Sequence, residues 1–466
     1  MKKRLTACMT AACLAATAVG VAVSLTGCGG EGDKFPTKES DPTASIDILL
    51  LANADETEFY NKYFARKAEE YGIKITFQGL EETPYEQKLD AALQGGNLPD
   101  IFYVRPNDIL QYKNNIYCLE QFKDTVATNE KLNLNLDNIA PLALDLYKYN
   151  DQTNMMDAKN GELYAFPKDL SVQQLGYNKT IVRIYANAIK AAGLKLPWEM
   201  DFRTENYSWQ EYRQMCEIIT REAKAAKNAH YASDVPDIEI LTKSFGGNVL
   251  NTETMQIEVT SAAATKAIDY QKSLVTGENP AADYTYATQA NFQAGKVAFY
   301  GMVGSWEVGT YDSALGEGNW DVMPWPTEDG SVNWNGKITS AGYVVSNKCK
   351  NWQVAMEIAA SFMTNRVQEE MVRDEKVSIP MSKSLQSAYL NSENDAVYSP
   401  KSRSVFIDVI NGDHGFRPAV YSTFEDGWMK PLNDELQKMW KGQSYSITAN
   451  TQKEMQRILD DYKNLY

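Results

Sequence analysis

Hydrophobic and polar positions follow a regular series over residues 46–104. Apolar runs at Ile46–Ala52 and Ile101–Val104, with the alternating segment Ile73–Gln78 between them, predict three β-strands. Apolar residues at helical spacing predict helices over Glu58–Tyr71 and Tyr85–Gln94, and glycine follows each of these segments. Strands and helices that alternate over about sixty residues form a βαβ series, which predicts parallel strands joined by right-handed crossovers.

Strand-like and helical segments continue to alternate along the rest of the chain, without an internal sequence repeat. We expect further helices over Trp209–Ala226, Val354–Asn365, Arg366–Asp374 and Thr451–Tyr462. Ser208 and Glu211 have the spacing of a capping box at the start of the first of these helices. The pattern therefore predicts an α/β fold in which mostly parallel sheets are flanked by helices.

Residues 1–27 have the layout of a secretory signal, with three basic residues at positions 2–4 before an uncharged, largely apolar run. Leu25–Cys28 resembles the lipobox of bacterial lipoproteins, which implies that Cys28 is lipidated and becomes the mature N-terminus. The alternative is a retained membrane-spanning helix, which the threonines and glycines and the lack of basic residues after the run disfavour. Residues 28–45 have little to bury, so we expect a flexible tether there.

The chain is acidic, with 46 basic and 61 acidic side chains and a net charge of −15. Residues 1–27 carry three of the basic side chains and none of the acidic ones, so their removal makes the net charge −18. A field of this sign repels the phosphates of nucleic acids and anionic lipid headgroups. We therefore expect no nucleic-acid partner, and contact with the membrane only through the lipid anchor.

The cysteines and histidines indicate neither a disulfide framework nor a metal site. Cys118, Cys216 and Cys349 follow the lipobox at scattered positions, and whether two of them pair stays open. With only His230 and His414 present, we expect no histidine-based zinc site, and we expect no cofactor. No phosphate-binding loop, Gly-x-Ser-x-Gly or His-Glu-x-x-His pattern occurs.

Six segments stand in a characteristic order along the chain. They are Gln94–Ile101, Gly161–Pro167, Gly176–Lys179, Tyr207–Glu211, Phe292–Ala298 with Gly304–Trp306 after it, and Ser340–Thr364. Each motif is weak alone, but in this order they resemble the extracellular solute-binding proteins of ABC importers. The resemblance is to the large sugar-binding group that includes maltose-binding protein.

The resemblance implies a two-lobed, periplasmic-binding-protein-like fold with the ligand in the cleft between the lobes. It places the chain crossings between lobes near Phe166–Asp169, Val322–Pro326 and Asp374–Pro380. The first lobe is then expected to contain residues 46–166 and 327–374, and the second lobe residues 167–326 and 375–466. Closure of the lobes on a hinge of two or three crossings would trap the ligand.

A sugar-binding cleft needs hydrogen-bonding side chains for hydroxyls and aromatic rings for the flat C–H faces. All 9 tryptophans and 27 tyrosines lie beyond residue 27. The resemblance places Trp306, with Glu307 beside it, at the Gly-x-Trp position that stacks on sugar, and Trp428 at a looser second stacking position. The alternative for either ring is ordinary core packing.

Polar candidates follow the first and third predicted strands, because open α/β sheets bind ligands at the carboxyl ends of their strands. Asn53 and Asp55 follow the first strand, although Asp55 could instead cap the next helix. Tyr103 lies near the end of the third strand, and Arg105 and Asn107 follow it. Further candidates, placed by motif position or as loop residues, are Asp169, Phe245, Trp334, Arg417 and Tyr421.

Together these features predict a monomeric, lipid-anchored substrate-binding protein on the extracytoplasmic face of a bacterial membrane, with the tether and acidic body favouring a Gram-positive surface. It would deliver a carbohydrate, first of all an oligosaccharide, to an ABC permease without catalysing a reaction. One alternative is a secreted glycoside hydrolase with two carboxylates across one bond. Others are the same fold with a peptide, a polyamine or a metal-bound anion as ligand, and a structural or adhesive lipoprotein without a closable cleft.

Overall fold

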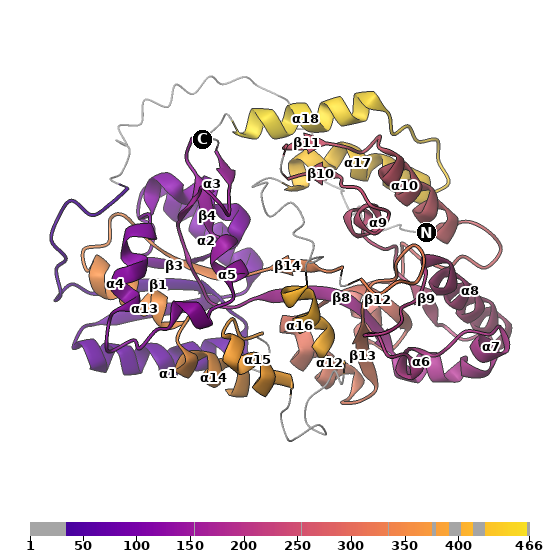
Figure 1. Cartoon of the computed structure of the whole chain (residues 1–466), viewed down its shortest axis with the longest axis horizontal. Helices are drawn as coiled ribbons and strands as arrows, with labels where there is room; N and C mark the ends of the chain where they lie inside the picture. Colours follow the sequence, from indigo (N-terminus) through magenta and orange to yellow (C-terminus); the bar gives the residue numbers. More distant parts are fainter. Residues whose placement is uncertain are drawn as a thin grey trace, which may run out of the picture.

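The computed structural model describes residues 34–152, 154–252, 254–333, 335–374, 379–390, 402–412 and 425–463. In Figure 1 these residues form two lobes that lie side by side, each with a β-sheet and surrounding helices. The expected signal segment, residues 1–27, and Cys28 lie outside the described residues.

The first lobe begins with the predicted βαβ series. Its elements are β1 (Ile46–Leu51), α1 (Ala54–Tyr71), β2 (Ile75–Leu80), α2 (Glu82–Gly95) and β3 (Ile101–Val104). Strand β1 pairs in parallel with β2 and β3, as predicted. Strands β15 (Gly342–Val345) and β7 (Phe166–Pro167) complete the sheet in the order β2-β1-β3-β15-β7, and both join it antiparallel.

Helix α1 begins at Ala54, four residues before the predicted start, because Asn53 caps it. The Asn53 side chain accepts a hydrogen bond from the Glu56 amide at 2.9 Å, and the Glu56 carboxylate accepts one from the Asn53 amide at 3.1 Å. Asp55 lies inside the first turn, so the alternative that Asp55 is the cap is wrong. Gly72 ends the helix in the left-handed conformation, with φ of 65°.

The second lobe is built on β8 (Ser171–Asn178). The sheet order is β13-β8-β12-β9, and β14 (Lys337–Thr339) also pairs with β8. Strands β12 (Val297–Gly304), β13 (Trp320–Met323) and β14 run antiparallel to β8, and only the pair of β12 with β9 (Tyr231–Ser233) in this described sheet is parallel. The two-lobed α/β fold is thus confirmed, but its sheets are mixed rather than mostly parallel.

The remaining described helices and short strands lie around the two sheets. Near the first sheet lie α3 (Ile109–Tyr112), α4 (Lys123–Ala127), α5 (Pro141–Asp145), α13 (Trp352–Ser361), α14 (Asn365–Asp374), α15 (Lys383–Leu390) and the small sheet of β4 (Lys148–Asn150), β5 (Met155–Met156) and β6 (Glu162–Leu163). Helix α16 (Ser404–Asn411) packs on β8.

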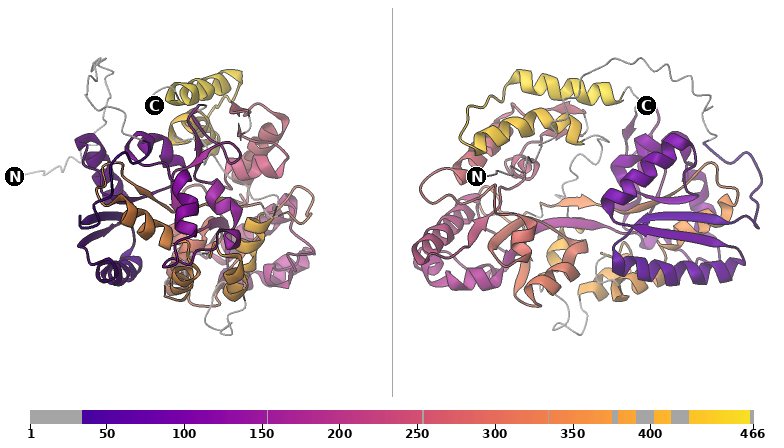
Figure 2. Two further views of the ribbon diagram at one scale, coloured as in Figure 1. Left: turned by 60° about the vertical axis from the view of Figure 1, so that its left-hand side comes forward. Right: turned by 180° about the vertical axis from the view of Figure 1, so that it is seen from behind.

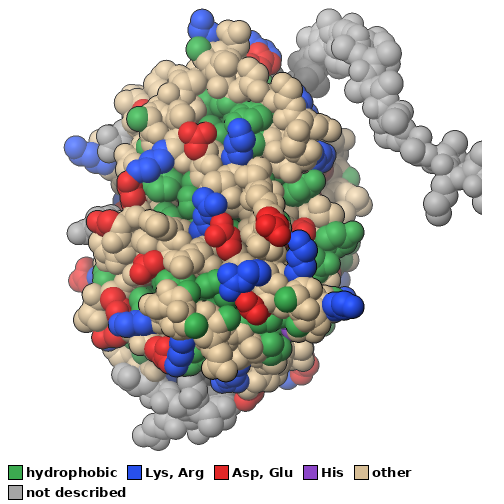
Figure 3. Space-filling model, turned by 90° about the vertical axis from the view of Figure 1, so that its right-hand side faces the viewer, with side chains coloured by type: hydrophobic (Ala, Val, Ile, Leu, Met, Phe, Trp, Pro, Cys, Tyr) green, Lys and Arg blue, Asp and Glu red, His purple; other side chains and the backbone are tan. Residues whose placement is uncertain are grey.

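Around the second sheet lie α6 (Lys179–Ile184), α7 (Ala186–Ala191), α8 (Trp209–Ala226), α9 (Ile238–Ser244), α10 (Ala262–Val275), α11 (Gln289–Gln293), α12 (Val308–Leu315), α17 (Glu425–Trp440), α18 (Ala449–Lys463) and the pair β10 (Leu250–Asn251) and β11 (Gln256–Ile257). Helix α8 has the predicted bounds, and Ser208 and Glu211 form the predicted capping box. Figure 3 shows basic and acidic side chains interspersed over the outer end of this lobe.

The first crossing between the sheets lies where it was predicted, between β7 and β8. The second does not lie near Val322–Pro326. It lies at Ser340–Ala341, because β14 still extends the ladder on β8 while β15 pairs with β3. The third expected crossing includes residues 375–378, which lie outside the described residues. Beyond them, Ile379 bridges Leu170 and Ser382 bridges Ile139, so this returning segment contacts the first lobe; the exact lobe boundaries stay a prediction.

The three cysteines after Cys28 are free thiols, and each is buried. Within the part of the chain that the structure describes, no group of histidine, cysteine and carboxylate side chains could hold a metal ion. In the same residues, no helix combines the length and the apolarity needed to cross a membrane.

Candidate ligand-binding cleft

A cavity of about 280 Å³ lies where the two crossings meet the first sheet. The ends of β1 and β3 supply one side, the crossing strands supply the floor, and Trp306 comes from the second lobe. Its lining residues are Leu51, Asn53, Glu56, Glu82, Tyr103, Arg105, Lys168, Asp169, Ser171, Trp306, Thr339, Ser340 and Ala341. The sequence-predicted residues Asn53, Tyr103, Arg105, Asp169 and Trp306 therefore come together in one cavity, which we call the hinge cavity.

Trp306 is the aromatic side chain that the second lobe offers to the hinge cavity. It lies in a short helical turn directly after β12, and its side chain is 38% exposed. A β-carbon at Gly304 would lie only 2.5 Å from its indole ring, so the absence of a side chain there lets the ring lie flat on the backbone. The exposed ring face is therefore held in place before any ligand binds.

Glu307 supports Trp306 and does not line the cavity. Its carboxylate accepts a hydrogen bond from the Gly304 amide at 2.9 Å, and the Gln289 side chain donates a second. Burial raises the pKa of Glu307, and these hydrogen bonds only partly offset that effect. We had expected Glu307 to contact ligand; among the described contacts it instead fixes the turn that carries Trp306.

The floor of the hinge cavity contains a buried ion pair that sequence reasoning missed. Lys168 Nζ lies 2.9 Å from a Glu56 carboxylate oxygen, 3.8 Å from Asp169 and 5.5 Å from the Tyr60 ring centroid. Burial acts to raise the pKa of Glu56, but the charge and hydrogen bond of Lys168 outweigh it, so that pKa is lowered. The available signal was the position of Lys168 beside Asp169 in the first crossing.

Asp169 ties the two crossings together. Its side chain accepts a hydrogen bond from the Ala341 amide at 3.1 Å, and its carbonyl accepts one from the Ser340 hydroxyl at 2.6 Å. The Lys168 amide donates to the Ala341 carbonyl at 2.7 Å. The candidate ligand residue Asp169 is thus also a structural link within the hinge.

Tyr103 and Arg105 extend the lining along the first lobe. Both also border a smaller hollow of about 170 Å³ between α2 and α3, together with Asp108. Arg105 pairs with Glu82 and, at 3.4 Å, with Glu86. Burial raises the pKa of Asp108 to about 6, although the Arg105 amide donates to its carboxylate at 2.7 Å.

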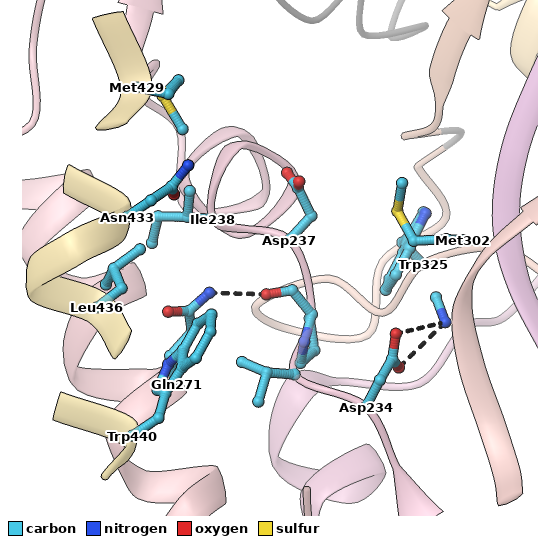
Figure 4. Close-up of a pocket in the computed structure, with 13 residues that line it drawn as sticks. Asp234, Asp237, Ile238, Gln271, Met302, Trp325, Met429, Asn433, Leu436 and Trp440 are labelled. Carbon is cyan, nitrogen blue, oxygen red and sulfur yellow. Dashed lines mark hydrogen bonds between the residues drawn. The ribbon is translucent and has the colours of Figure 1, made fainter. Parts of the chain in front are cut away.

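A second cavity, of about 240 Å³, lies within the second lobe between α9, β12 and α17 (Figure 4). The Gly301 amide donates to both oxygens of Asp234, each at 3.1 Å, as the dashed lines in Figure 4 show. Asp237 accepts a hydrogen bond from Lys337 at 2.8 Å. We call this the second-lobe cavity.

Buried polar atoms without a hydrogen-bond partner among the described residues border the second-lobe cavity. They include the acceptor Gln271 Oε1 and the indole donors of Trp325 and Trp440. A buried donor or acceptor without a partner costs free energy, so a ligand that both donates and accepts hydrogen bonds would relieve it. Sequence reasoning missed these residues, because Trp325 and Trp440 carry no signal beyond being two tryptophans among nine and Gln271 carries none.

Besides Glu307, three predicted ligand residues do not line either cavity. Trp428 is 0% exposed in the core of the second lobe, and its neighbour Met429 lines the second-lobe cavity instead, because one helical residue turns the side chain by about 100°. Phe245 packs on Tyr270 and Lys266. Asn107, two residues after Arg105, lines neither cavity.

The other candidates lie outside the described part of the chain. They are the side chain of Asp55 and the residues Trp334, Arg417 and Tyr421.

Replacing Asp234 with asparagine should change how stability depends on pH. Burial raises the pKa of Asp234 from its ordinary value of 3.8 to about 7, so the folded chain binds a proton that the unfolded chain has released. Between these values the wild-type protein therefore loses stability as pH rises, by at most about 4 kcal/mol. Asp234→Asn keeps an acceptor for Gly301 and should remove this loss.

Melting temperatures of both proteins at pH values of about 4, 6 and 8 test this. The difference in favour of Asp234→Asn should widen with pH. Parallel pH curves for the two proteins would contradict the assignment of this titration to Asp234.

Comparison with known proteins agrees with the two-lobed arrangement. A family model described as bacterial extracellular solute-binding protein matches residues 62–396. Among proteins of curated function, no significant match to the sequence is found.

Several solved structures share the fold. An ABC substrate-binding protein from Listeria monocytogenes in complex with cycloalternan is 18% identical, with a TM-score of 0.68 over 91% of this chain and 99% of that one. The GacH receptor of Streptomyces glaucescens, solved without ligand and in complex with acarbose, is 16% identical, with a TM-score of 0.65 over 91% of this chain and 98% of that one. A maltose-bound protein from T. maritima is 15% identical, with a TM-score of 0.63 over 91% and 100%.

Proposed function

The chain belongs to the bacterial extracellular solute-binding proteins, and we propose that it captures an oligosaccharide between its lobes and delivers it to an ABC permease. One observation carries the choice of ligand: the half-exposed face of Trp306 lies over a cavity bordered by amide, carboxylate and tyrosine side chains. Such a ring suits the C–H face of a sugar, and the polar rim suits its hydroxyls. The sugars bound by structurally similar proteins support this choice.

Each part of the cleft would have a separate role in capture. Trp306 would stack on one sugar unit, while Asn53, Tyr103 and Asp169 would accept or donate hydrogen bonds at its edge. The unpaired groups around Gln271 and Trp325 would receive a further unit in the second-lobe cavity. Because Trp306 belongs to the second lobe and its partners to the first, binding would favour the closed arrangement of the lobes.

The protein would perform no chemical step on the ligand, and lipid on Cys28 would anchor it to the membrane. The body would work as a monomer on the outer face of the membrane, where the closed form docks on the permease. ATP hydrolysis would take place in a separate subunit, since the chain has no phosphate-binding loop.

A thermal-shift screen of the purified protein against mono- and oligosaccharides, peptides and polyamines tests the proposed ligand class. An oligosaccharide at a hundred times its Kd should stabilise the protein by about 2.7 kcal/mol. Stabilisation by a peptide or a polyamine alone would keep the fold and overturn the ligand. Release of shorter sugars during an overnight incubation would indicate a hydrolase instead.

A further inference from the structure

Residues 34–45, which we expected to be part of a flexible tether, lie against the first lobe as a strap. Figures 1 and 2 draw this indigo segment along the end of the first lobe that faces away from the second. The strap ends where β1 begins, so it is continuous with the central strand pairing of the first sheet.

The start of the strap is held by Lys34. Its ammonium group lies 2.6 Å from Asp151 and also pairs with Glu162, and its carbonyl accepts a hydrogen bond from the Cys118 amide at 3.0 Å. The same ammonium group lies 5.7 Å from the Tyr164 ring centroid. Burial acts to lower the pKa of Lys34, but the hydrogen bonds to the two carboxylates outweigh it, so that pKa is raised.

The end of the strap is held by the segment that begins α13. The Trp352 indole donates to the Lys38 carbonyl at 3.1 Å, and the Asp41 amide donates to the Lys350 carbonyl at 2.9 Å. Asn351 is fully buried, and its side chain donates a hydrogen bond to the Ala44 carbonyl at 3.1 Å. The partners of the strap end follow the second crossing in the sequence, and the partners of Lys34 precede the first crossing. The strap therefore contacts both of the chain portions that make up the first lobe.

We propose that the strap couples the membrane anchor rigidly to the first lobe and leaves the second lobe to move. This inference rests on the proposed lipidation of Cys28. With the strap docked, six Cα steps separate Cys28 from Lys34, and a fully extended chain spans about 20 Å over that length. With the strap released, the anchor would reach Ile46 over about 60 Å.

Two consequences follow for the interaction with the membrane. The first lobe is held close to the bilayer at the end that carries Lys34, Asp151 and Glu162. Since every described strap contact named above belongs to the first lobe, closure on a ligand moves the second lobe relative to the anchor and leaves the strap contacts unchanged.

The test compares a released variant with a matched control in the lipidated full-length protein. Lys34→Glu combined with Trp352→Phe removes the two ion pairs at the start of the strap and the indole hydrogen bond at its end, while the phenyl ring still packs next to Phe122. Lys38→Glu makes the same charge change within the strap at an exposed side chain, and its carbonyl still accepts from Trp352. The single variant Lys34→Glu serves if the double variant melts early.

Hydrogen exchange at the Asp41 amide reports strap docking without reference to lipid. We expect exchange at least about tenfold faster in the released variant than in wild type, and no change in Lys38→Glu. Exchange that is already fast in wild type, equal to that of an unstructured segment, would overturn the docked strap.

Neutron reflectometry on a supported bilayer reports the coupling to the membrane. The gap between bilayer and protein should stay within about 20 Å for wild type and Lys38→Glu, and widen for the released variant. An unchanged gap after release would overturn the coupling. Failure of the wild-type protein to form a layer would instead refute lipid anchoring, while the exchange result would still decide whether the strap is docked.

Discussion

Trp306→Ala is expected to weaken oligosaccharide binding by about 30-fold or more. Aromatic side chains at the centre of a binding site commonly contribute about 2 kcal/mol or more, and about 1.4 kcal/mol corresponds to tenfold in Kd. The ring is 38% exposed and rests on the Gly304 backbone, so its removal leaves the core of the second lobe intact. Isothermal titration with the oligosaccharide found by the thermal-shift screen measures the change.

Trp198→Ala is the matched control for this experiment. Trp198 is 37% exposed, lies in the second lobe and packs against Arg183, away from both cavities. It should lower stability about as much as Trp306→Ala and leave Kd unchanged. Equal Kd values for wild type and Trp306→Ala would place the sugar elsewhere and remove the main support for the hinge cavity as the binding site.

Lys168→Met is expected to destabilise the protein by about 3 kcal/mol near neutral pH. Removing one partner of a buried ion pair leaves the other charge without compensation, which typically costs about 3–5 kcal/mol. Here the substitution would leave Glu56 and Asp169 facing each other in the floor of the hinge cavity. Denaturant unfolding of the ligand-free protein measures the loss, and ligand affinity should fall with it.

The pH dependence separates this charge effect from a simple packing defect. Without Lys168, the carboxyl of Glu56 would be more easily protonated, so the loss of stability should shrink as pH falls toward the ordinary Glu value of 4.5. Lys62→Met removes the partner of Glu58 in an exposed pair on the same helix and should leave stability unchanged. A loss that does not vary with pH would contradict the buried-charge explanation.

Local sequence patterns predicted the first elements of the first lobe and the start of α8 in the second lobe well, because each pattern has a local physical cause. The βαβ series over residues 46–104 and the capping box of Ser208 and Glu211 depend on side chains that are close in sequence. The second crossing was predicted too early because its position depends on pairing between β14 and β8, which are far apart along the chain. Pairing between distant strands leaves no comparable local signal.

The candidate site was predicted in part for the same reason. Residues that follow the strands β1 and β3 were found because chain position alone places them at the edge of the sheet. Trp428 was misplaced because a helix of uncertain rotation puts adjacent residues on different faces, and burial decides which of them meets the cavity. Lys168 was missed because its role depends on Glu56, more than a hundred residues earlier.

Each lobe contains at least one buried free thiol, whose alkylation rate reports how often that lobe exposes it. Cys118 and Cys349 belong to the first lobe and Cys216 to α8 in the second, and burial raises the pKa of Cys118 to about 12. A thiol reagent attacks the thiolate, so alkylation requires local unfolding that exposes the buried thiol to solvent. Mass spectrometry of the alkylated peptides would therefore give the rate of local unfolding of each lobe separately. The protein needs no substitution for this, and the rates can be compared with and without sugar.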